Sequence, residues 1–274
     1  IEHAILALKA AYDEGVRTIV DVTTMDLGRD VGILEEVSRK SGVQIIACTG
    51  TWRDIPRVFW DVSPDIIAPL YIREIEEGIQ GTGIKAGIIK VANDKGGVTP
   101  RGEIILRAAA RAHKATGIPI STHSWAPERV GFQQIRIFEE EGIDLNRVYV
   151  GHSNDTTNLD YLTTLLKKGA WLGLDRYPGG RADGIDTPQW EDRTRTVAKL
   201  IEAGFGDRIM LSHDWSIPLT RLNKIEMKRR EDANPDGYLF ITRKVLPLLR
   251  QLGITDRQID QIMVYNPRQF LTGT

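Results

Sequence analysis

The sequence predicts an α/β fold in which parallel strands alternate with helices, and specifically a (β/α)8 barrel. Short runs of β-branched residues alternate with helical segments of about ten to fifteen residues, as in βαβ units. The repeating unit is roughly thirty residues long, and polar residues recur at the ends of the strands, as they do at the mouth of a barrel. The 274 residues are compatible with one domain spanning 1–274.

Seven strands are expected, each a short apolar run. They cover residues 17–24, 43–50, 87–93, 118–125, 147–154, 170–177 and 208–215. Because the chain opens on a helical segment, we expect the strand missing from the sequence to be the first of the barrel. An open doubly wound sheet is the alternative fold, but the glycine-rich phosphate-binding turns that such sheets usually carry, GxGxxG or GxxxxGK[ST], are absent from the sequence.

The segments between the strands have helical periodicity. Helices are expected at 1–15, 103–117, 158–169 and 193–205, followed by a helical tail at 237–253 and 255–271. Several of these segments end in glycine, the residue that favours a helix C-cap. Pro247 is expected to interrupt the first tail helix, and His113 is expected on an exposed face of the 103–117 helix.

Composition narrows the function classes. The net charge of −1 gives no reason to expect a nucleic-acid partner, and the apolar runs are too short to span a membrane. The one cysteine, Cys48, excludes an internal disulfide framework, so a cytoplasmic protein is the default expectation. Cys48 itself is expected to be a small buried residue. The chain begins at Ile1, which leaves open whether a signal segment precedes it.

Four ionisable residues lie near the ends of four predicted strands: Lys90, His123, His152 and Asp214. The carboxyl ends of barrel strands meet at one mouth, so these residues are expected to be neighbours. Imidazole and carboxylate are ligands of zinc, cobalt, manganese or iron. A lysine in an apolar strand is costly unless it is paired. Carbamylated, Lys90 would be an anion able to bridge two cations.

Each residue taken alone also has an ordinary structural explanation. Lys90 could pair with Asp21 or Asp175 across the barrel mouth, and Asp214 could cap the turn after its strand. A single buried histidine is usually a core residue. His213 is expected to point away from Asp214, because successive side chains in a strand alternate. Four such residues at matching strand ends nevertheless favour a joint metal site.

The sequence resembles the phosphotriesterase family of the amidohydrolase superfamily, and most closely its lactonase branch. The resemblance extends in order through nearly the whole chain. It is carried by the runs DVTTMDLGRD, IIKVAN, THSW, VYVGHSND, LGLDRYPG, RIMLSHDW and NPRQFL. It implies a hydrolase with two divalent metals, zinc or else cobalt, iron or manganese, bridged by a hydroxide and a carbamylated lysine that matches Lys90.

The resemblance also assigns roles to further residues. His123 and His152 would hold the more exposed metal, while Asp214 would bind the buried metal and move a proton. Arg176 would line the substrate pocket, which favours a lactone substrate. The flanks of that pocket would be formed by Tyr177, Thr51 and Trp52, and the loop 216–240 would cover the substrate.

The sequence departs from the family pattern at one point, because it lacks the His-x-His motif that supplies two more metal ligands at the end of the first strand. Three functions therefore remain open: a lactonase acting on N-acyl homoserine lactones with side activity on phosphotriesters, a primary organophosphate triesterase, and a non-catalytic barrel lacking its first strand. A homodimer is expected from the resemblance, with residues 51–60 as one possible contact segment.

Overall fold

The structure is a computed structural model that describes residues 1–182, 185–217 and 224–274. Its centre is a seven-stranded parallel sheet in the order β1-β2-β3-β4-β5-β6-β9. The strands are β1 Thr18–Asp21, β2 Gln44–Gly50, β3 Ile88–Ala92, β4 Ile120–His123, β5 Val148–Val150, β6 Trp171–Leu174 and β9 Ile209–Leu211. All seven lie within the predicted ranges, and the predicted α/β barrel-type fold is confirmed as an incomplete barrel whose edges are β1 and β9.

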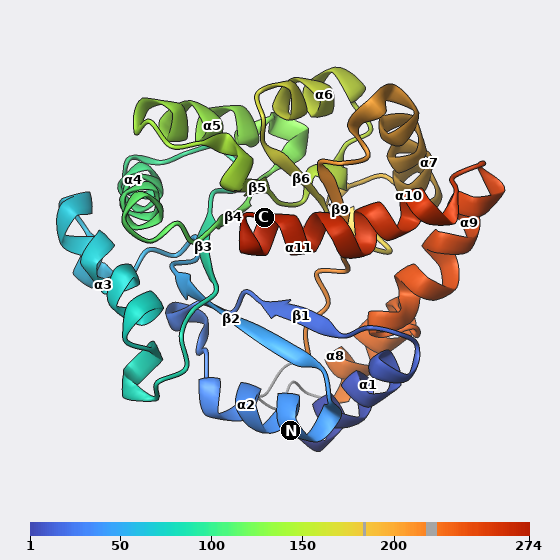
Figure 1. Cartoon of the computed structure of the whole chain (residues 1–274), viewed down its shortest axis with the longest axis horizontal. Coiled ribbons are helices and arrows are strands. Elements are labelled where there is room, and N and C mark those ends of the chain that lie inside the picture. Colours follow the sequence, from blue (N-terminus) through green and yellow to red (C-terminus); the bar gives the residue numbers. More distant parts are fainter. Residues whose placement is uncertain (183–184, 218–223) are drawn as a thin grey trace.

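Helices surround the curled sheet on its outer side, and the last helix of the described residues crosses the middle of the view (Figure 1). They are α1 Glu2–Asp13, α2 Val31–Ser41, α3 Pro64–Glu76, α4 Pro100–Thr116, α5 Val130–Glu140, α6 Leu159–Lys167, α7 Trp190–Leu200, α8 Lys224–Ala233, α9 Leu246–Gln251, α10 Asp256–Asp260 and α11 Asn266–Thr272. None of the helices in the described part of the chain is long and apolar enough to cross a membrane.

Short 3₁₀ and π segments connect these elements. The 3₁₀ helices cover Met25–Leu27, Arg57–Phe59, Ile79–Gly81, Ala126–Glu128, Leu145–Arg147, Ser153–Asp155 and Gly237–Leu239. The π segments are Ile201–Phe205, Ile241–Val245 and Gln261–Tyr265. Pro247 lies in the first turn of α9, where the helix changes from a π segment to α geometry.

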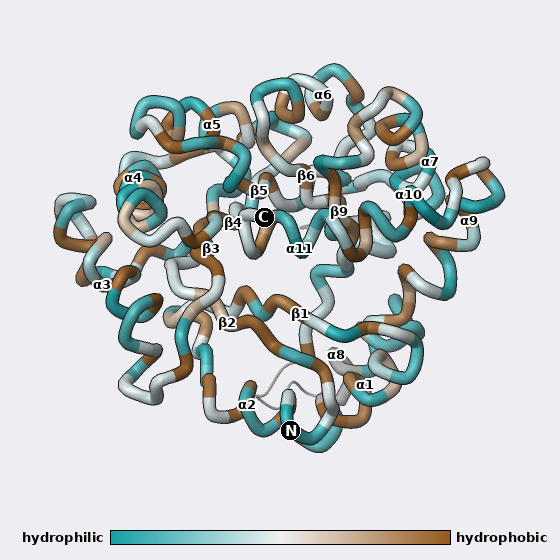
Figure 2. Tube along the Cα trace, viewed as in Figure 1, coloured by the Kyte–Doolittle hydropathy of each residue, from teal (hydrophilic) through white to brown (hydrophobic). Residues whose placement is uncertain are grey.

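Two apolar layers pack on opposite faces of the sheet. Outside the sheet, strand residues such as Ile89 and Val91 pack against the helices in the largest cluster. Inside the barrel, side chains from β2, β3, β6, β9 and α11 form a second cluster of Cys48, Ile88, Trp171, Met210 and Phe270. Helix α11 crosses the middle of the view in Figure 1, and Figure 2 shows the strands beneath it mainly in the colour of hydrophobic residues.

The position of His113 differs from the prediction. The residue is 8% exposed, and its Nδ1 lies 2.8 Å from the carbonyl oxygen of Ile118. Helix α4 is covered by α3 on one side and α5 on the other, so most of its circumference is buried. Alanines make up much of those faces and give only a weak hydrophobic pattern, which is why the sequence indicated exposure. Cys48, in contrast, is fully buried as predicted.

Candidate active site

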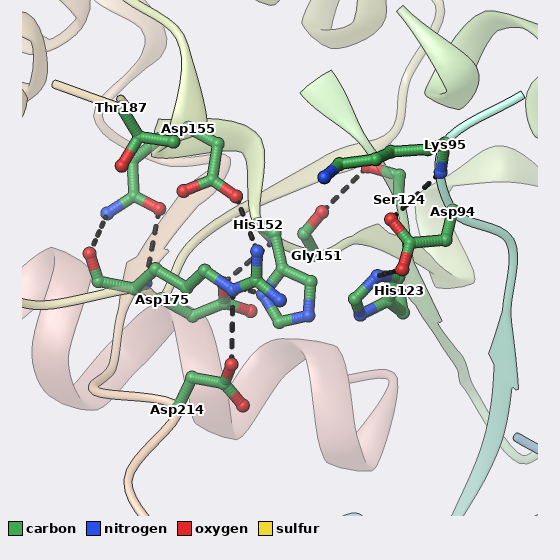
Figure 3. A network of polar contacts seen from close by, with 12 residues as sticks. Asp94, Lys95, His123, Ser124, Gly151, His152, Asp155, Asp175, Thr187 and Asp214 are labelled. Carbon is green, nitrogen blue, oxygen red and sulfur yellow. Dashed lines mark hydrogen bonds and ion pairs between the residues drawn. The ribbon is translucent and has the colours of Figure 1, made fainter. Parts of the chain in front are cut away.

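Lys90, His123 and His152 come together at the carboxyl ends of β3, β4 and β5. Strands β3 and β4 pair so that Ala92 is opposite His123. Lys90 lies two residues before Ala92 and therefore on the same face of β3 as Ala92. The imidazole rings of His123 and His152 are 4.4 Å apart between centroids, in a T-shaped contact (Figure 3). Both histidines and Lys90 are at least 97% buried.

Lys90 is a buried amine without a hydrogen bond or ion pair to any residue that the structure describes. Its Nζ lies 5.8 Å from the centroid of the Trp52 ring. Burial lowers the pKa of Lys90, and the charges of Asp175 and Asp214 oppose this decrease. Among the described residues, neither of the alternative ion pairs of Lys90, with Asp21 or with Asp175, is formed, and one carboxylate oxygen of Asp21 accepts from the backbone N–H of Thr23 at 2.9 Å.

His152 is held firmly by Asp175, which follows β6. One carboxylate oxygen, Oδ1, lies 2.9 Å from the Nδ1 of His152 and accepts from its backbone N–H at 2.7 Å. The other oxygen accepts from the hydroxyl of Tyr149 at 2.9 Å. Gly173 is required for this arrangement, because a Cβ there would lie 2.3 Å from the Tyr149 ring.

The contact with Asp175 determines which nitrogen of His152 is available. Burial places the pKa of His152 well below its ordinary value, and a charge on His123 would lower it further, so the imidazole is neutral near pH 7. With Nδ1–H donated to Asp175, the lone pair remains on Nε2. The backbone of His152 is left-handed, with φ at 59°, a conformation that costs about 1–3 kcal/mol for a non-glycine residue and occurs often at functional sites.

His123 has two ring nitrogens without a hydrogen-bond partner among the described residues, although both are buried. Its nearest carboxylate is that of Asp94, with Nε2 and Oδ2 3.5 Å apart. Burial lowers the pKa of His123, which also favours the neutral ring. The Trp52 ring covers it at 4.8 Å between centroids.

Asp214 lies further out and is paired with Arg176. Its side chain is 43% exposed, its φ is 51°, and its Oδ2 accepts from the Nε of Arg176 at 3.1 Å (Figure 3). A second bond joins Nη1 of Arg176 to Asp155 at 2.7 Å. Arg176 is therefore engaged by two carboxylates. His213 packs instead against the ring of Tyr238, so it points away from Asp214 as expected.

Of the other predicted pocket residues, Thr51 adjoins the cluster through its backbone, because its N–H donates to the carbonyl oxygen of Lys90 at 2.9 Å. The hydroxyl of Thr51 is buried in a 2.6 Å hydrogen bond with Tyr71. Tyr177 is 2% exposed and stacks on Phe240 at 6.4 Å between centroids. Residues 218–223 of the predicted covering loop lie outside the described residues. A role for any of these residues in substrate binding stays a prediction.

The donor set is suited to a divalent metal. Two neutral imidazoles with available nitrogens lie beside a buried amine that forms no ion pair with the described residues, and a carbamate at Lys90 would supply an anionic oxygen there. Within the described residues, no group of three or more His, Cys, Asp or Glu side chains could hold a metal by itself. The modification of Lys90 is therefore what would complete such a site.

Sequence reasoning missed two carboxylates of this region, Asp94 and Asp155. Asp94 lies two residues after the end of β3 and could have been found from its place after the strand that carries Lys90. Asp155 ends a 3₁₀ turn and is fully buried between two arginines, Arg176 and Arg193. A single residue in a turn has no periodic signal, so its burial could not be predicted.

A barrel-type α/β fold with a buried polar cluster at the carboxyl ends of its strands has the layout of (β/α)8-barrel enzymes. Residues 1–271 match the phosphotriesterase family. The chain belongs to this family, and with it to a class of hydrolases.

Curated relatives support the same assignment. A phosphotriesterase homology protein of Mycobacterium tuberculosis is 40% identical over 280 residues, which cover 98% of this chain and 83% of the relative. An aryldialkylphosphatase of Saccharolobus solfataricus is 38% identical over 98% of this chain and 85% of the relative. A human N-acetyltaurine hydrolase is 31% identical over 99% of this chain and 77% of the relative.

Proposed function

We propose that this protein is a metal-dependent hydrolase that opens lactones of the N-acyl homoserine lactone type and also cleaves phosphotriesters. The observation that carries the metal site is the contact of two buried imidazoles at 4.4 Å, with nitrogens available for coordination beside the buried Lys90. The preference for lactones is supported by Arg176, the residue that the resemblance to the lactonase branch assigns to the substrate pocket.

Lys90, as its carbamate, would hold divalent metal together with His123, His152 and Asp214. Bound metal supplies a water molecule of lowered pKa and polarises the bond that is broken. Asp175 keeps the Nδ1–H of His152 engaged, so that ring presents Nε2. Asp214, which is partly exposed and paired with Arg176, would accept a proton from the attacking water. Trp52 limits access of bulk water above His123.

A primary phosphotriesterase is the second candidate, and a specific observation favours it. The relative named aryldialkylphosphatase is 38% identical over nearly all of this chain. In addition, Arg176 is bound by two carboxylates, which leaves its guanidinium less free to orient a lactone ring. The human relative is named an N-acetyltaurine hydrolase, so an N-acyl amide is a third substrate to be tested.

Metal content is the first test. The protein is expressed with supplemented zinc or cobalt and desalted, and metal per chain is measured by elemental analysis. Two ions would agree with the full family site, and one ion would agree with the ligands present in this sequence. Absence of bound metal from correctly folded protein would contradict the proposal and favour a non-catalytic barrel.

Turnover then separates the substrates. We would compare kcat/KM for a long-chain N-acyl homoserine lactone, paraoxon and an N-acetylated aminosulfonate on the same metal-loaded preparation. A Lys90→Met variant is the matched control, because it fills the same buried volume without an amine that carbon dioxide can modify. A large advantage for paraoxon would refute lactone as the preferred substrate, and equal rates in the control would refute the role of Lys90.

We also propose a homodimer. Val58 and Trp60, in the segment 51–60, are exposed apolar residues, 73% and 40% accessible. Sedimentation equilibrium of the wild type and of a Val58→Lys variant tests this contact. A monomeric wild type would exclude it.

A further inference from the structure

Asp94 is fixed by a tight turn immediately after β3. The backbone N–H of Gly97 donates to the carbonyl oxygen of Asp94 at 3.0 Å, and both Gly96 and Gly97 have φ at 83°, as this turn requires. The carboxylate oxygen Oδ1 accepts from the backbone N–H of Lys95 at 2.9 Å. One oxygen of Asp94 is thus used by its own turn, which directs the other, Oδ2, away from it.

Oδ2 of Asp94 connects the loops that follow three successive strands. It lies 3.5 Å from the Nε2 of His123, at the end of β4, and it forms an ion pair with Arg53, in the loop after β2. The Asp94 side chain is 11% exposed, whereas that of Arg53 is 46% exposed. Figure 3 shows the carboxylate beside the His123 ring, on the side away from His152.

Each histidine therefore has a carboxylate beside one ring nitrogen, at 2.9 Å for His152 and at 3.5 Å for His123. His152 has Asp175 from the neighbouring β6 at its Nδ1, and His123 has Asp94 from the neighbouring β3 at its Nε2. The two rings meet between these carboxylates. A carboxylate at one imidazole nitrogen fixes the tautomer, because it accepts the N–H and leaves the lone pair on the opposite nitrogen.

We propose that Asp94 is a positioning residue that sets the orientation and tautomer of His123, and that Arg53 holds Asp94 in place for this task. Nδ1 of His123 is then the nitrogen presented to a metal, with Nε2–H directed at Asp94. The inference rests on the proposed metal site, which His123 would share with His152 and Lys90. Arg53 follows Trp52 in the chain, so the same ion pair also restrains the ring that covers His123.

Zinc affinity tests the proposal independently of turnover. The dissociation constant for Zn²⁺ is measured by competition with a chromophoric chelator for the wild type, Asp94→Ala and Asp94→Asn. We expect both variants to bind zinc about 10–100-fold more weakly, the range found when such a partner is removed. Asp54→Asn is the matched control, since Asp54 is an exposed aspartate of the loop that carries Arg53. Arg53→Gln is expected to weaken binding by a smaller factor.

The tautomer of His123 gives a second readout that needs no metal. Nitrogen-15 NMR of the histidine side chains is expected to show the Nε2–H form in the wild type and a mixture in Asp94→Ala. Unchanged zinc affinity together with an unchanged tautomer would overturn the proposal. Failure of the wild type to bind zinc would contradict the proposed function, while the NMR result would still decide the role of Asp94. If circular dichroism shows that Asp94→Ala is unfolded, the zinc affinity and the histidine tautomer of Asp94→Asn are used instead to accept or reject the proposal.

Discussion

Removal of the Asp155 carboxylate should cost more stability than any other single polar change near the site. Its side chain has no exposed surface, and its two oxygens accept from Nη1 of Arg176 at 2.7 Å and from Nη2 of Arg193 at 2.9 Å. Arg193 is also fully buried. In Asp155→Ala, the charge of Arg193 would lose its only carboxylate partner within the described residues, although Pro188 and Thr187 still accept hydrogen bonds from it.

The expected magnitude follows from that burial. Breaking a buried ion pair by removing one partner costs about 3–5 kcal/mol, because the remaining charge is left uncompensated. Arg176 should contribute little to this cost, because it is partly exposed and keeps Asp214. The free energy of unfolding is measured by urea denaturation at 25 °C, with unchanged m-values required for the comparison.

A double variant provides the control. Asp155→Leu combined with Arg193→Met removes both charges and replaces them with apolar groups, so it should be more stable than Asp155→Ala. A loss below about 1 kcal/mol in Asp155→Ala would refute the reasoning, and so would a double variant as unstable as the single one.

Three further changes test other parts of the structure. Gly50→Ala should lower the free energy of unfolding by about 3 kcal/mol or more, because its Cβ would lie 1.9 Å from the carbonyl oxygen of Lys90. In Gly96→Ala the new Cβ meets no atom within 4 Å, so the loss measured by urea unfolding should be only about 1 kcal/mol. Burial lowers the pKa of His113, so as the pH falls this histidine is protonated in the unfolded state before it is protonated in the folded state. The free energy of unfolding should therefore decrease as the pH drops below about 6.5. His113→Gln should reduce this acid-induced loss in urea titrations, and an unchanged loss would contradict the assignment. Burial raises the pKa of Cys48 to about 12, so its thiol should react with Ellman's reagent only after unfolding; rapid reaction in buffer would show that it is accessible.

The strands could be predicted from the sequence because most of their residues are buried or half-buried in the structure. A continuous apolar run bounded by polar residues marks such a strand, and its C-terminal end marks the position of a candidate site residue. This pattern predicts that Lys90, His123 and His152 are neighbours, and the structure brings these three together.

The features of the fold and of the candidate site that could not be predicted depend on tertiary contacts, which leave no pattern in the sequence. The two-residue strands β7 Arg181–Ala182 and β8 Ile185–Asp186 pair with each other, but two residues are too few to show alternation. The engagement of Arg176 by Asp155 joins residues 21 positions apart in loops, and loop conformation is not fixed by strand periodicity. His113 is buried in a contact with the carbonyl oxygen of Ile118, in the turn after its helix, which helical periodicity does not describe.

The order of synthesis gives the interior cluster a further significance. Phe270 of α11 packs at 5.8 Å between ring centroids against both Tyr149 and Trp171, from β5 and β6. A ribosome makes all seven strands before it makes α11, so the nascent barrel would leave these aromatic surfaces open until α11 emerges. During that interval a chaperone that recognises exposed aromatic residues has its best opportunity to bind, and a prematurely terminated chain would keep the same surfaces uncovered.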